Sequence, residues 1–242
     1  MNSKMDKKTV LITGGSGALG NSIVRIFRRE GHDVAFTYNS RKEKAAELSR
    51  ETGASAFKAD LTKKEDVTKA VSEILKIFGR IDILVNNAGL TQVMPFALIE
   101  EEDWDAVITA NLKSMFLVTR EVVCGMIARK EGVIINIGSL AGHRLLEVPV
   151  HYATAKAGVM GFTLSLAKEL SRYNIRVNSV VPGLLDEGVG KMVPEKEMKE
   201  YMNYCTAGRP GKTGEVAEVV FFLASPCASY VNAQNIFVDG GI

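Results

Sequence analysis

The stretch TVLITGGSGALGNSIVRIFRREGHDVAFTY, Thr9–Tyr38, contains an apolar run, a glycine cluster, an amphipathic segment and a second apolar run. Gly15, Gly17 and Gly20 have the spacing G-x-G-x-x-G directly after the first run. Glycine lets a turn adopt positive φ and lets its backbone approach a pyrophosphate, and the N-terminus of the following helix attracts the phosphate charge. The stretch therefore predicts a strand–turn–helix–strand unit that binds a dinucleotide; a tight turn without a ligand is the alternative.

Apolar runs and amphipathic segments alternate along the rest of the chain. Seven runs predict strands: Val10–Thr13, Val34–Tyr38, Ser55–Ala59, Ile83–Asn86, Val133–Ile137, Arg176–Val181 and Asn235–Val238. Several are continuously apolar, as expected for strands covered on both faces. Helical spacing predicts three buried faces: Ile23, Val24, Ile26 and Phe27; Val67, Val71, Ile74, Leu75 and Phe78; and Phe162, Leu166 and Leu170. We predict an α/β fold, a single Rossmann-type doubly wound parallel sheet of about seven strands with helices on both faces.

Composition excludes several classes of protein. The chain has 242 residues, of which 46% are hydrophobic and 24% charged, and its net charge is only +2. That balance is typical of a globular domain and argues against nucleic-acid or membrane-surface binding. The N-terminal MNSKMDKK lacks the apolar core of a signal peptide, and no apolar run approaches the ~18 residues of a membrane span. We expect a cytoplasmic protein.

The cysteines support the same expectation. Cys124, Cys205 and Cys227 are odd in number and lack metal-ligand spacing. Reduced thiols are expected in the cytoplasm, so we predict neither a disulfide framework nor a metal site.

No repeat, low-complexity tract or linker divides the chain, so residues 1–242 are expected to form one catalytic domain. The least regular part is 182–215, in which glycines and prolines surround a helical pattern at Glu195–Tyr204. The segment follows a strand's carboxyl end, where ligands bind in open α/β sheets, so we predict a lid over the site. A surface loop without function is the alternative.

Two further motifs carry chemistry. ILVNNAGL, Ile83–Leu90, places two amides and a glycine at the end of a central strand. Tyr152 and Lys156 lie four positions apart at the start of a predicted helix, which puts both on one face. Ser139 follows the preceding strand. A tyrosine–lysine pair alone is usually a helix-surface pair, but the nearby serine favours a catalytic group.

These segments together resemble the short-chain dehydrogenases/reductases from about Lys8 to the C-terminus. TGGSGALG, ADL, NNAG, NLKSMF, IGS, YATAK, RVNSVVPG and VDGG carry the resemblance. Within the family, the chain most resembles the bacterial 3-oxoacyl-(acyl-carrier-protein) reductases of fatty-acid biosynthesis. Reductases of sugars, cyclic alcohols and steroids share the motifs and are the alternative, and a non-catalytic dinucleotide-binding protein is a third.

The resemblance implies a catalytic role for four residues. Tyr152 would protonate the substrate carbonyl oxygen, and Ser139 would hydrogen-bond that oxygen. Lys156 would hold the nicotinamide ribose and favour tyrosinate by its charge, and Asn111 would hold a water in a proton relay. A free tyrosine has a pKa of ~10, so a neighbouring ammonium would ease release of its proton.

The resemblance also implies a cofactor site. Its residues would be Gly14, Ser16, Gly17, Ala18, Leu19, Gly20, Tyr38, Asn39, Ser40, Arg41, Asp60, Leu61, Asn87, Ala88, Gly89, Tyr152, Lys156, Pro182 and Gly183. The chain departs from the family pattern at two of the relevant places. Ala18 stands at a usual glycine, with Gly17 where many NADP-dependent relatives have arginine. Glu187 stands where a threonine usually contacts the nicotinamide carboxamide.

The end of the second predicted strand favours NADP(H), with NAD(H) also usable. NAD enzymes tend to place an acid there for the ribose hydroxyls, but this chain has Tyr38. Asn39 and Ser40 could bind a 2′-phosphate through hydrogen bonds, and Arg41 or Lys42 could bind it through charge. Asn39 or Ser40 could instead cap the next helix, and both roles are compatible.

The resemblance finally implies partners. The substrate would be an acyl thioester carried by acyl carrier protein or coenzyme A, or another small molecule. Relatives form homotetramers through two long helices, here around Glu102–Ala128 and Tyr152–Ser171, and through the C-terminal strand.

Overall fold

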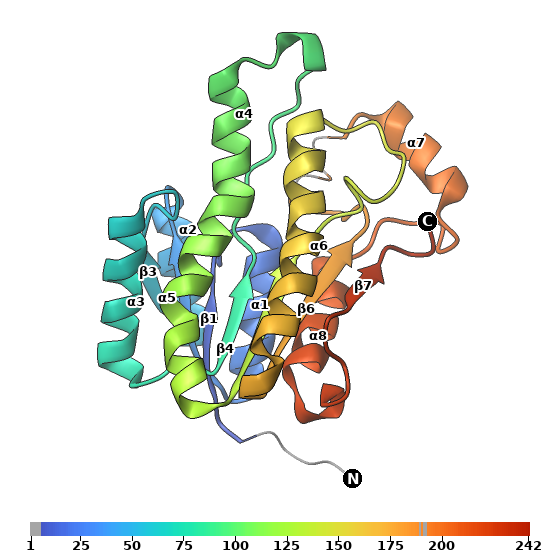
Figure 1. Cartoon of the computed structure of the whole chain (residues 1–242). Helices are drawn as coiled ribbons and strands as arrows, with labels where there is room; N and C mark the ends of the chain where they lie inside the picture. Colours follow the sequence, from blue (N-terminus) through green and yellow to red (C-terminus); the bar gives the residue numbers. More distant parts are fainter. Residues whose placement is uncertain (1–5, 189, 191–192) are drawn as a thin grey trace.

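The computed structural model describes residues 6–188, 190 and 193–242. The described part of the chain contains one parallel sheet (Figure 1). Its strands are β1 (Thr9–Ile12), β2 (Asp33–Tyr38), β3 (Ser55–Lys58), β4 (Ile83–Asn86), β5 (Gly132–Ile137), β6 (Ile175–Pro182) and β7 (Asn235–Val238). Each predicted strand is confirmed with its ends within one residue. The apolar runs located the strands because both faces of this sheet are covered.

The strand order β3-β2-β1-β4-β5-β6-β7 confirms the doubly wound fold. The chain moves outward from β1 to β3, then returns to the other side of β1 to form β4. The order therefore reverses between β1 and β4, and in open α/β sheets ligands bind at the carboxyl ends of the strands beside such a reversal. The segments expected to bind the cofactor lie at the ends of strands on this edge, except for Tyr152 and Lys156, which lie on a helix.

Helices cover both faces of the sheet (Figure 1). One face carries α1 (Ala18–Arg29), α2 (Lys42–Thr52) and α8 (Thr213–Ala224), and the other carries α3 (Lys64–Phe78), α5 (Ser114–Arg129) and α6 (Val150–Leu170). The remaining helices are α4 (Glu101–Ile108) and α7 (Glu195–Tyr204), with a π-helical turn at Thr109–Lys113 and 3-10 turns at Phe96–Leu98, Ser171–Tyr173 and Pro226–Ala228.

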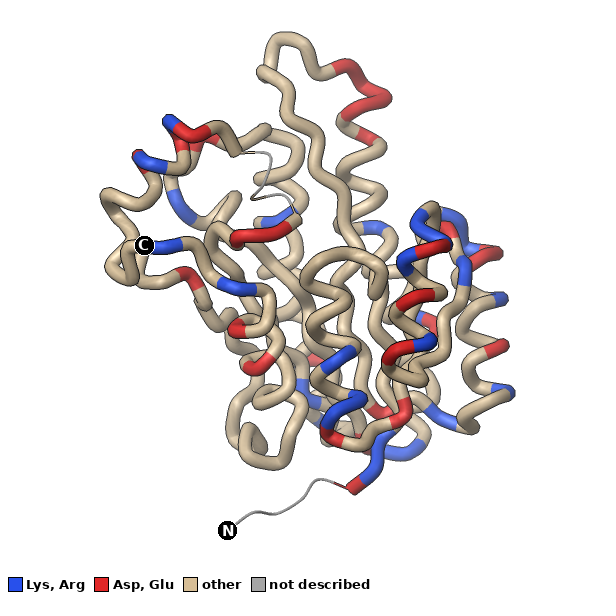
Figure 2. Tube along the Cα trace, turned by 180° about the vertical axis from the view of Figure 1, so that it is seen from behind, with Lys and Arg blue, Asp and Glu red and all other residues tan. Residues whose placement is uncertain are grey.

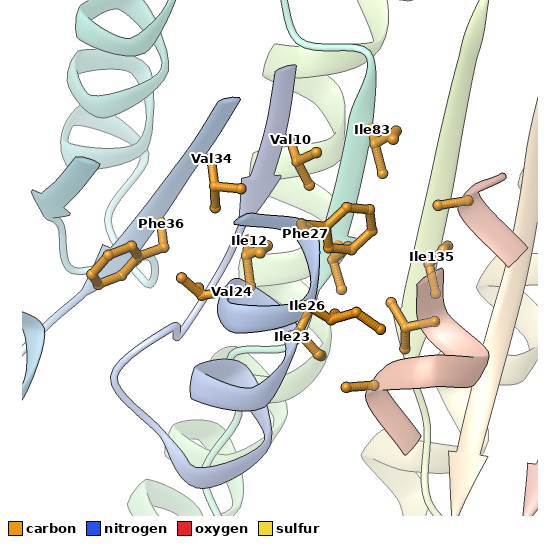
Figure 3. Packing of buried hydrophobic residues seen from close by; sticks show 14 of the residues in the cluster. Val10, Ile12, Ile23, Val24, Ile26, Phe27, Val34, Phe36, Ile83 and Ile135 are labelled. Atoms are coloured by element: carbon orange, nitrogen blue, oxygen red, sulfur yellow. The ribbon is translucent and has the colours of Figure 1, made fainter. Parts of the chain in front are cut away.

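The hydrophobic core has two parts, one on each face of the sheet, because successive strand residues face opposite sides. Val10 and Ile12 of β1 face α1, whereas Leu11 faces α3 and α5. Figure 3 shows the predicted face of α1 against β1, β2 and β4, with Phe27 fully buried. The prediction for α3 is wrong at Leu75, which is 38% exposed because it lies at the rim of a groove between α3 and α5.

The charges lie mainly on the outer helices. Figure 2 shows both signs interspersed along α2 and α3. In the part of the chain that the structure describes, no helix has the length and apolar character needed to cross a membrane.

Candidate active site

The glycine turn after β1 packs too closely for side chains at three positions. Gly14 has φ +68°, and a Cβ there would lie 3.0 Å from the Ala88 Cα. A Cβ at Gly15 would lie 2.6 Å from the Phe36 ring, and one at Gly20 would lie 2.3 Å from the Gly14 carbonyl oxygen. Gly17 differs, because its nearest described neighbour would be 3.3 Å away. A side chain at Gly17 would therefore require only a small shift of the Gly14 carbonyl, unlike one at the other three positions.

The start of α1 offers donors to an anion. Gly17 is the N-cap residue in an extended conformation, and no described side chain caps this helix. Ala18 and Leu19 follow as its first two residues, where N–H groups have no intrahelical acceptor. The bare turn and the uncapped helix end fit the pyrophosphate of a dinucleotide.

Thr13 joins this turn to the end of β4. Its hydroxyl oxygen accepts hydrogen bonds from the N–H groups of Asn87 and Ala88, both at 2.9 Å. The Asn87 side-chain amide donates to the carbonyl oxygens of Thr13 at 2.9 Å and Gly14 at 3.2 Å. Sequence reasoning missed Thr13, although it directly precedes the glycine cluster.

The expected 2′-phosphate group lies at the end of β2. Asn39, Ser40 and Arg41 are all exposed there, directly after Tyr38. The proposed helix cap is wrong: Arg41 occupies the N-cap position of α2, and no side chain caps that helix. Asn39 and Ser40 precede the helix, and their side chains make none of the hydrogen bonds found among the described residues.

Asp60 and Leu61 form a turn after β3. The Asp60 carboxylate accepts hydrogen bonds from the Thr62 N–H at 3.1 Å and the Thr62 hydroxyl at 2.7 Å. The hydroxyl bond is the main cause that lowers the pKa of Asp60. This carboxylate is therefore committed to its own turn, which fits a positioning role better than chemistry.

Tyr152 and Lys156 lie in the first two turns of α6, as predicted. The Lys156 Nζ lies 5.8 Å from the centroid of the Tyr152 ring. It donates a 3.0 Å hydrogen bond to the carbonyl oxygen of Ile137, the last residue of β5. Burial lowers the pKa of Lys156 to about 8. The amine is thus fixed between the helix and the strand that leads to Ser139.

Burial raises the pKa of Tyr152, and a polar contact with the Ser139 side chain opposes that rise. The Ser139 hydroxyl oxygen also accepts the Ala141 N–H at 3.1 Å, which fixes the loop after β5. The contact brings Ser139 and Tyr152 together as predicted. The pKa of Tyr152 is not lowered as expected, because desolvation of the phenol is the larger effect.

Asn111 lies in the π-helical turn between α4 and α5. Its amide donates to the carbonyl oxygens of Leu90 at 2.7 Å and Val107 at 2.9 Å. Its Oδ1 is buried without a partner among the described residues. A Cβ at Gly89 would lie 2.6 Å from that oxygen and 3.7 Å from the Lys156 Nζ. The lack of a side chain at Gly89 therefore leaves space between the Asn111 Oδ1 and the Lys156 Nζ, and a water there could bridge the two atoms.

Pro182 is the last residue of β6, and Gly183 follows it, beside the loop that carries Ser139. The Leu140 N–H donates to the Pro182 carbonyl oxygen at 3.3 Å. Further along, Gly188 has φ +66°, and a Cβ there would lie 3.5 Å from the Ala18 Cβ. Gly188 of the segment 182–215 therefore lies beside Ala18 at the start of α1, the residue that departs from the family pattern. Glu187 is exposed, and residues 189, 191 and 192 of the segment lie outside the described residues.

A glycine turn at the crossover of a parallel sheet, beside a Ser–Tyr–Lys–Asn group, defines the class of dinucleotide-dependent oxidoreductases. The chain belongs to one family of this class, the short-chain dehydrogenases/reductases. A family model described as enoyl-(acyl carrier protein) reductase matches residues 15–242.

Curated relatives match over the whole chain. The 3-oxoacyl-(acyl-carrier-protein) reductase FabG of Thermotoga maritima is 39% identical over 99% of both chains. The protein of the same name from Chlamydia muridarum is 36% identical over 100% of both. Nodulation protein G of Rhizobium meliloti is 37% identical over 97% of this chain and 96% of its own.

Proposed function

We propose that this protein reduces a 3-oxoacyl thioester to the 3-hydroxyacyl thioester with NADPH, in fatty-acid biosynthesis. The observation that carries the proposal is the group formed by Tyr152, Ser139 and Lys156 at the carboxyl end of β5, where a carbonyl oxygen can meet two hydroxyls. The names of the relatives supply the substrate class, a 3-oxoacyl group on acyl carrier protein. Coenzyme A is a second carrier to test.

Cofactor binding is assigned to the edge formed by the strand ends. The turn from Gly14 to Gly20 and the start of α1 would hold the pyrophosphate. The residues after β2 and β3 would hold the adenosine end, and Asn87–Gly89, Lys156 and Pro182–Gly183 would hold the nicotinamide end. When bound, the nicotinamide supplies the hydride that reaches the carbonyl carbon.

Tyr152 and Ser139 act at the carbonyl oxygen. Both hydroxyls donate hydrogen bonds to it, which stabilises negative charge as the hydride arrives at carbon. Tyr152 then gives its proton to that oxygen. The raised pKa keeps the phenol protonated until the oxygen becomes basic enough to take the proton.

Lys156 and Asn111 restore the proton. With a pKa of about 8, Lys156 is mostly protonated at pH 7, so its charge stabilises the tyrosinate left after transfer. The unpartnered Oδ1 of Asn111 would hold a water near the amine. That water would return a proton from solvent through Lys156 to Tyr152.

We further propose that NADP(H) is preferred and that NAD(H) is also used. Tyr38 presents no carboxylate to the ribose hydroxyls, and the exposed Arg41 offers a cation to a 2′-phosphate. Gly17 lacks the second cation that many relatives have. The expected preference is therefore modest.

The working assembly is proposed to be a cytoplasmic homotetramer. Phe116 on α5 is 47% exposed and Leu164 on α6 is 46% exposed, so both helices carry apolar surface that a second copy could cover. All three cysteines are free, which supports a reducing compartment.

A substrate panel tests the proposal. Oxidation of NADPH is followed with acetoacetyl thioesters of acyl carrier protein and coenzyme A, with crotonyl thioesters, and with sugars, cyclic ketones and ketosteroids. We expect the 3-oxoacyl thioesters to have the highest kcat/KM. A higher value for crotonyl thioester would favour the enoyl reduction in the family description, and a higher value for a free ketone would assign the site to another carbonyl substrate. No turnover with any compound would favour a non-catalytic dinucleotide-binding protein.

A further inference from the structure

Helix α7 contacts the segment that ends β6. Figure 1 shows α7 beside the C-terminus, near the ends of β6 and β7. The backbone of Pro182–Leu184 is held by four hydrogen bonds to four separate parts of the chain. They are Leu140 N–H to Pro182 O at 3.3 Å, Gly183 N–H to Val238 O at 3.0 Å, Gly211 N–H to Leu184 O at 2.9 Å, and Leu184 N–H to the Tyr201 hydroxyl oxygen at 3.0 Å. Only the last uses a side chain.

Tyr201 fits closely against this segment. A Cβ at Gly183 would lie 2.5 Å from the Tyr201 hydroxyl oxygen, so the hydroxyl occupies space that any side chain at 183 would need. Burial raises the pKa of Tyr201, which keeps the phenol neutral. The Leu184 N–H therefore has a fixed neutral acceptor on α7.

Helix α7 is itself anchored at its C-terminal end. Cys205 directly follows it and is buried, with its thiol 3.5 Å from the Gly240 carbonyl oxygen. The Ala207 N–H donates to the same oxygen at 2.9 Å. A Cβ at Gly240 would lie 2.8 Å from the Cys205 sulfur, so this contact is also close-packed. Tyr201 thus extends from a helix that the C-terminal segment holds in place.

We propose that Tyr201 is a positioning residue that holds Pro182–Leu184 in the conformation that receives the nicotinamide end of the cofactor. This inference rests on the proposed function, which assigns Pro182 and Gly183 to that end. Tyr201 acts through the Leu184 N–H and through its contact with Gly183, and in the described part of the chain it makes no hydrogen bond to Ser139, Tyr152, Lys156 or Asn111. The Leu140–Pro182 hydrogen bond extends its effect to the loop that carries Ser139.

Loss of the hydroxyl would reduce cofactor affinity more than turnover. Without the Tyr201 hydroxyl, the Leu184 N–H loses its acceptor. The segment Pro182–Leu184 can then adopt other conformations before cofactor binds. The apparent affinity for cofactor is then the intrinsic affinity multiplied by the fraction of molecules in the binding-competent conformation. Once cofactor is bound, the segment is in place again and the chemical step proceeds. A net hydrogen bond of ordinary strength predicts about a fivefold to tenfold loss of affinity.

The test compares Tyr201→Phe with Tyr204→Phe. Tyr204 lies on the same helix and its side chain is 78% exposed, so its variant controls for loss of a hydroxyl from α7. NADPH affinity is measured by fluorescence titration without substrate. The KM for NADPH, kcat with acetoacetyl thioester, thermal midpoint and amide hydrogen exchange of the peptide containing Leu184 are measured alongside.

We expect Tyr201→Phe to raise the NADPH Kd and KM about fivefold to tenfold, with kcat within twofold and faster exchange at Leu184. Tyr204→Phe should match the wild type. An NADPH Kd within twofold of wild type in Tyr201→Phe would overturn the inference, even if the thermal midpoint or the exchange rate changed, because the residue would then be structural only. A wild type that binds NADPH but reduces no 3-oxoacyl thioester would refute the proposed function and leave this test valid.

Discussion

Replacing Lys156 with methionine should stabilise the fold while it removes activity. The Lys156 side chain is buried with 6% of the residue exposed, and burial lowers its pKa from 10.5 to about 8. At about 1.4 kcal/mol per pKa unit, that difference costs the folded state about 3 kcal/mol at pH 7. Losing the hydrogen bond to the Ile137 carbonyl offsets about 1 kcal/mol. Lys156→Met should therefore raise the free energy of unfolding by about 2 kcal/mol at pH 7.

The direction of the Lys156 pKa shift determines how its effect on stability depends on pH. Because the folded-state pKa lies below the unfolded-state value, the protonated amine destabilises the fold at pH values below about 8. The penalty disappears as the pH rises from about 8 to 10.5, because the unfolded chain then also loses its proton. The stability advantage of Lys156→Met should be fully present at pH 7 and close to zero at pH 10.

Urea denaturation of wild type and variant, at pH 7 and at pH 10 and at fixed protein concentration, measures the difference in free energy of unfolding at each pH. Lys168→Met is the control, because Lys168 lies on the same helix but is exposed, and it should change stability by less than about 0.5 kcal/mol. Of the two variants, only Lys156→Met should lose turnover with acetoacetyl thioester. A variant less stable than wild type at pH 7, or an advantage that persists unchanged at pH 10, would refute the reasoning about burial.

Three further predictions concern the site and the assembly. Tyr152→Phe should lower kcat by ~10²–10⁴-fold and leave NADPH affinity within about twofold, because only the proton donor is lost; a variant that keeps a tenth of wild-type kcat would assign the acid elsewhere. Arg41→Ala should lower kcat/KM with NADPH about tenfold and spare NADH, since only NADPH carries the 2′-phosphate, and Tyr38→Asp should shift preference toward NADH; equal losses with both cofactors in Arg41→Ala would contradict the assignment. Light scattering at micromolar concentration should give four chain masses, and a monomer would refute the tetramer.

The fold could be predicted because its signals are local. Each strand is a short apolar run between turn residues, and α1 has a helical apolar spacing, so neither depends on knowing the partner element. Leu75 was predicted wrongly because helical spacing reports which residues share a face. How far the neighbouring helix α5 covers that face is a property of the tertiary structure.

The site could be predicted only where a motif repeats a family pattern. Tyr152, Lys156 and Ser139 lie together as expected, because a fixed helical spacing and a strand end determine their positions. The π-helical turn at Asn111 has no sequence period that distinguishes it from an α-helix. Thr13 and Tyr201 act through backbone groups 74 and 17 residues away, so only the folded chain reveals them.

The reaction with deuterated NADPH tests the central claim most directly. Wild-type protein is supplied with acetoacetyl thioester and NADPH carrying deuterium at the transferred position of the nicotinamide, and the product is analysed by mass spectrometry and NMR. We predict a 3-hydroxybutyryl thioester with one deuterium on C3, and no such product from Tyr152→Phe under the same conditions. A saturated product formed only from crotonyl thioester, or unchanged acetoacetyl thioester after complete incubation with wild type, would contradict the assignment of this site to 3-oxoacyl reduction.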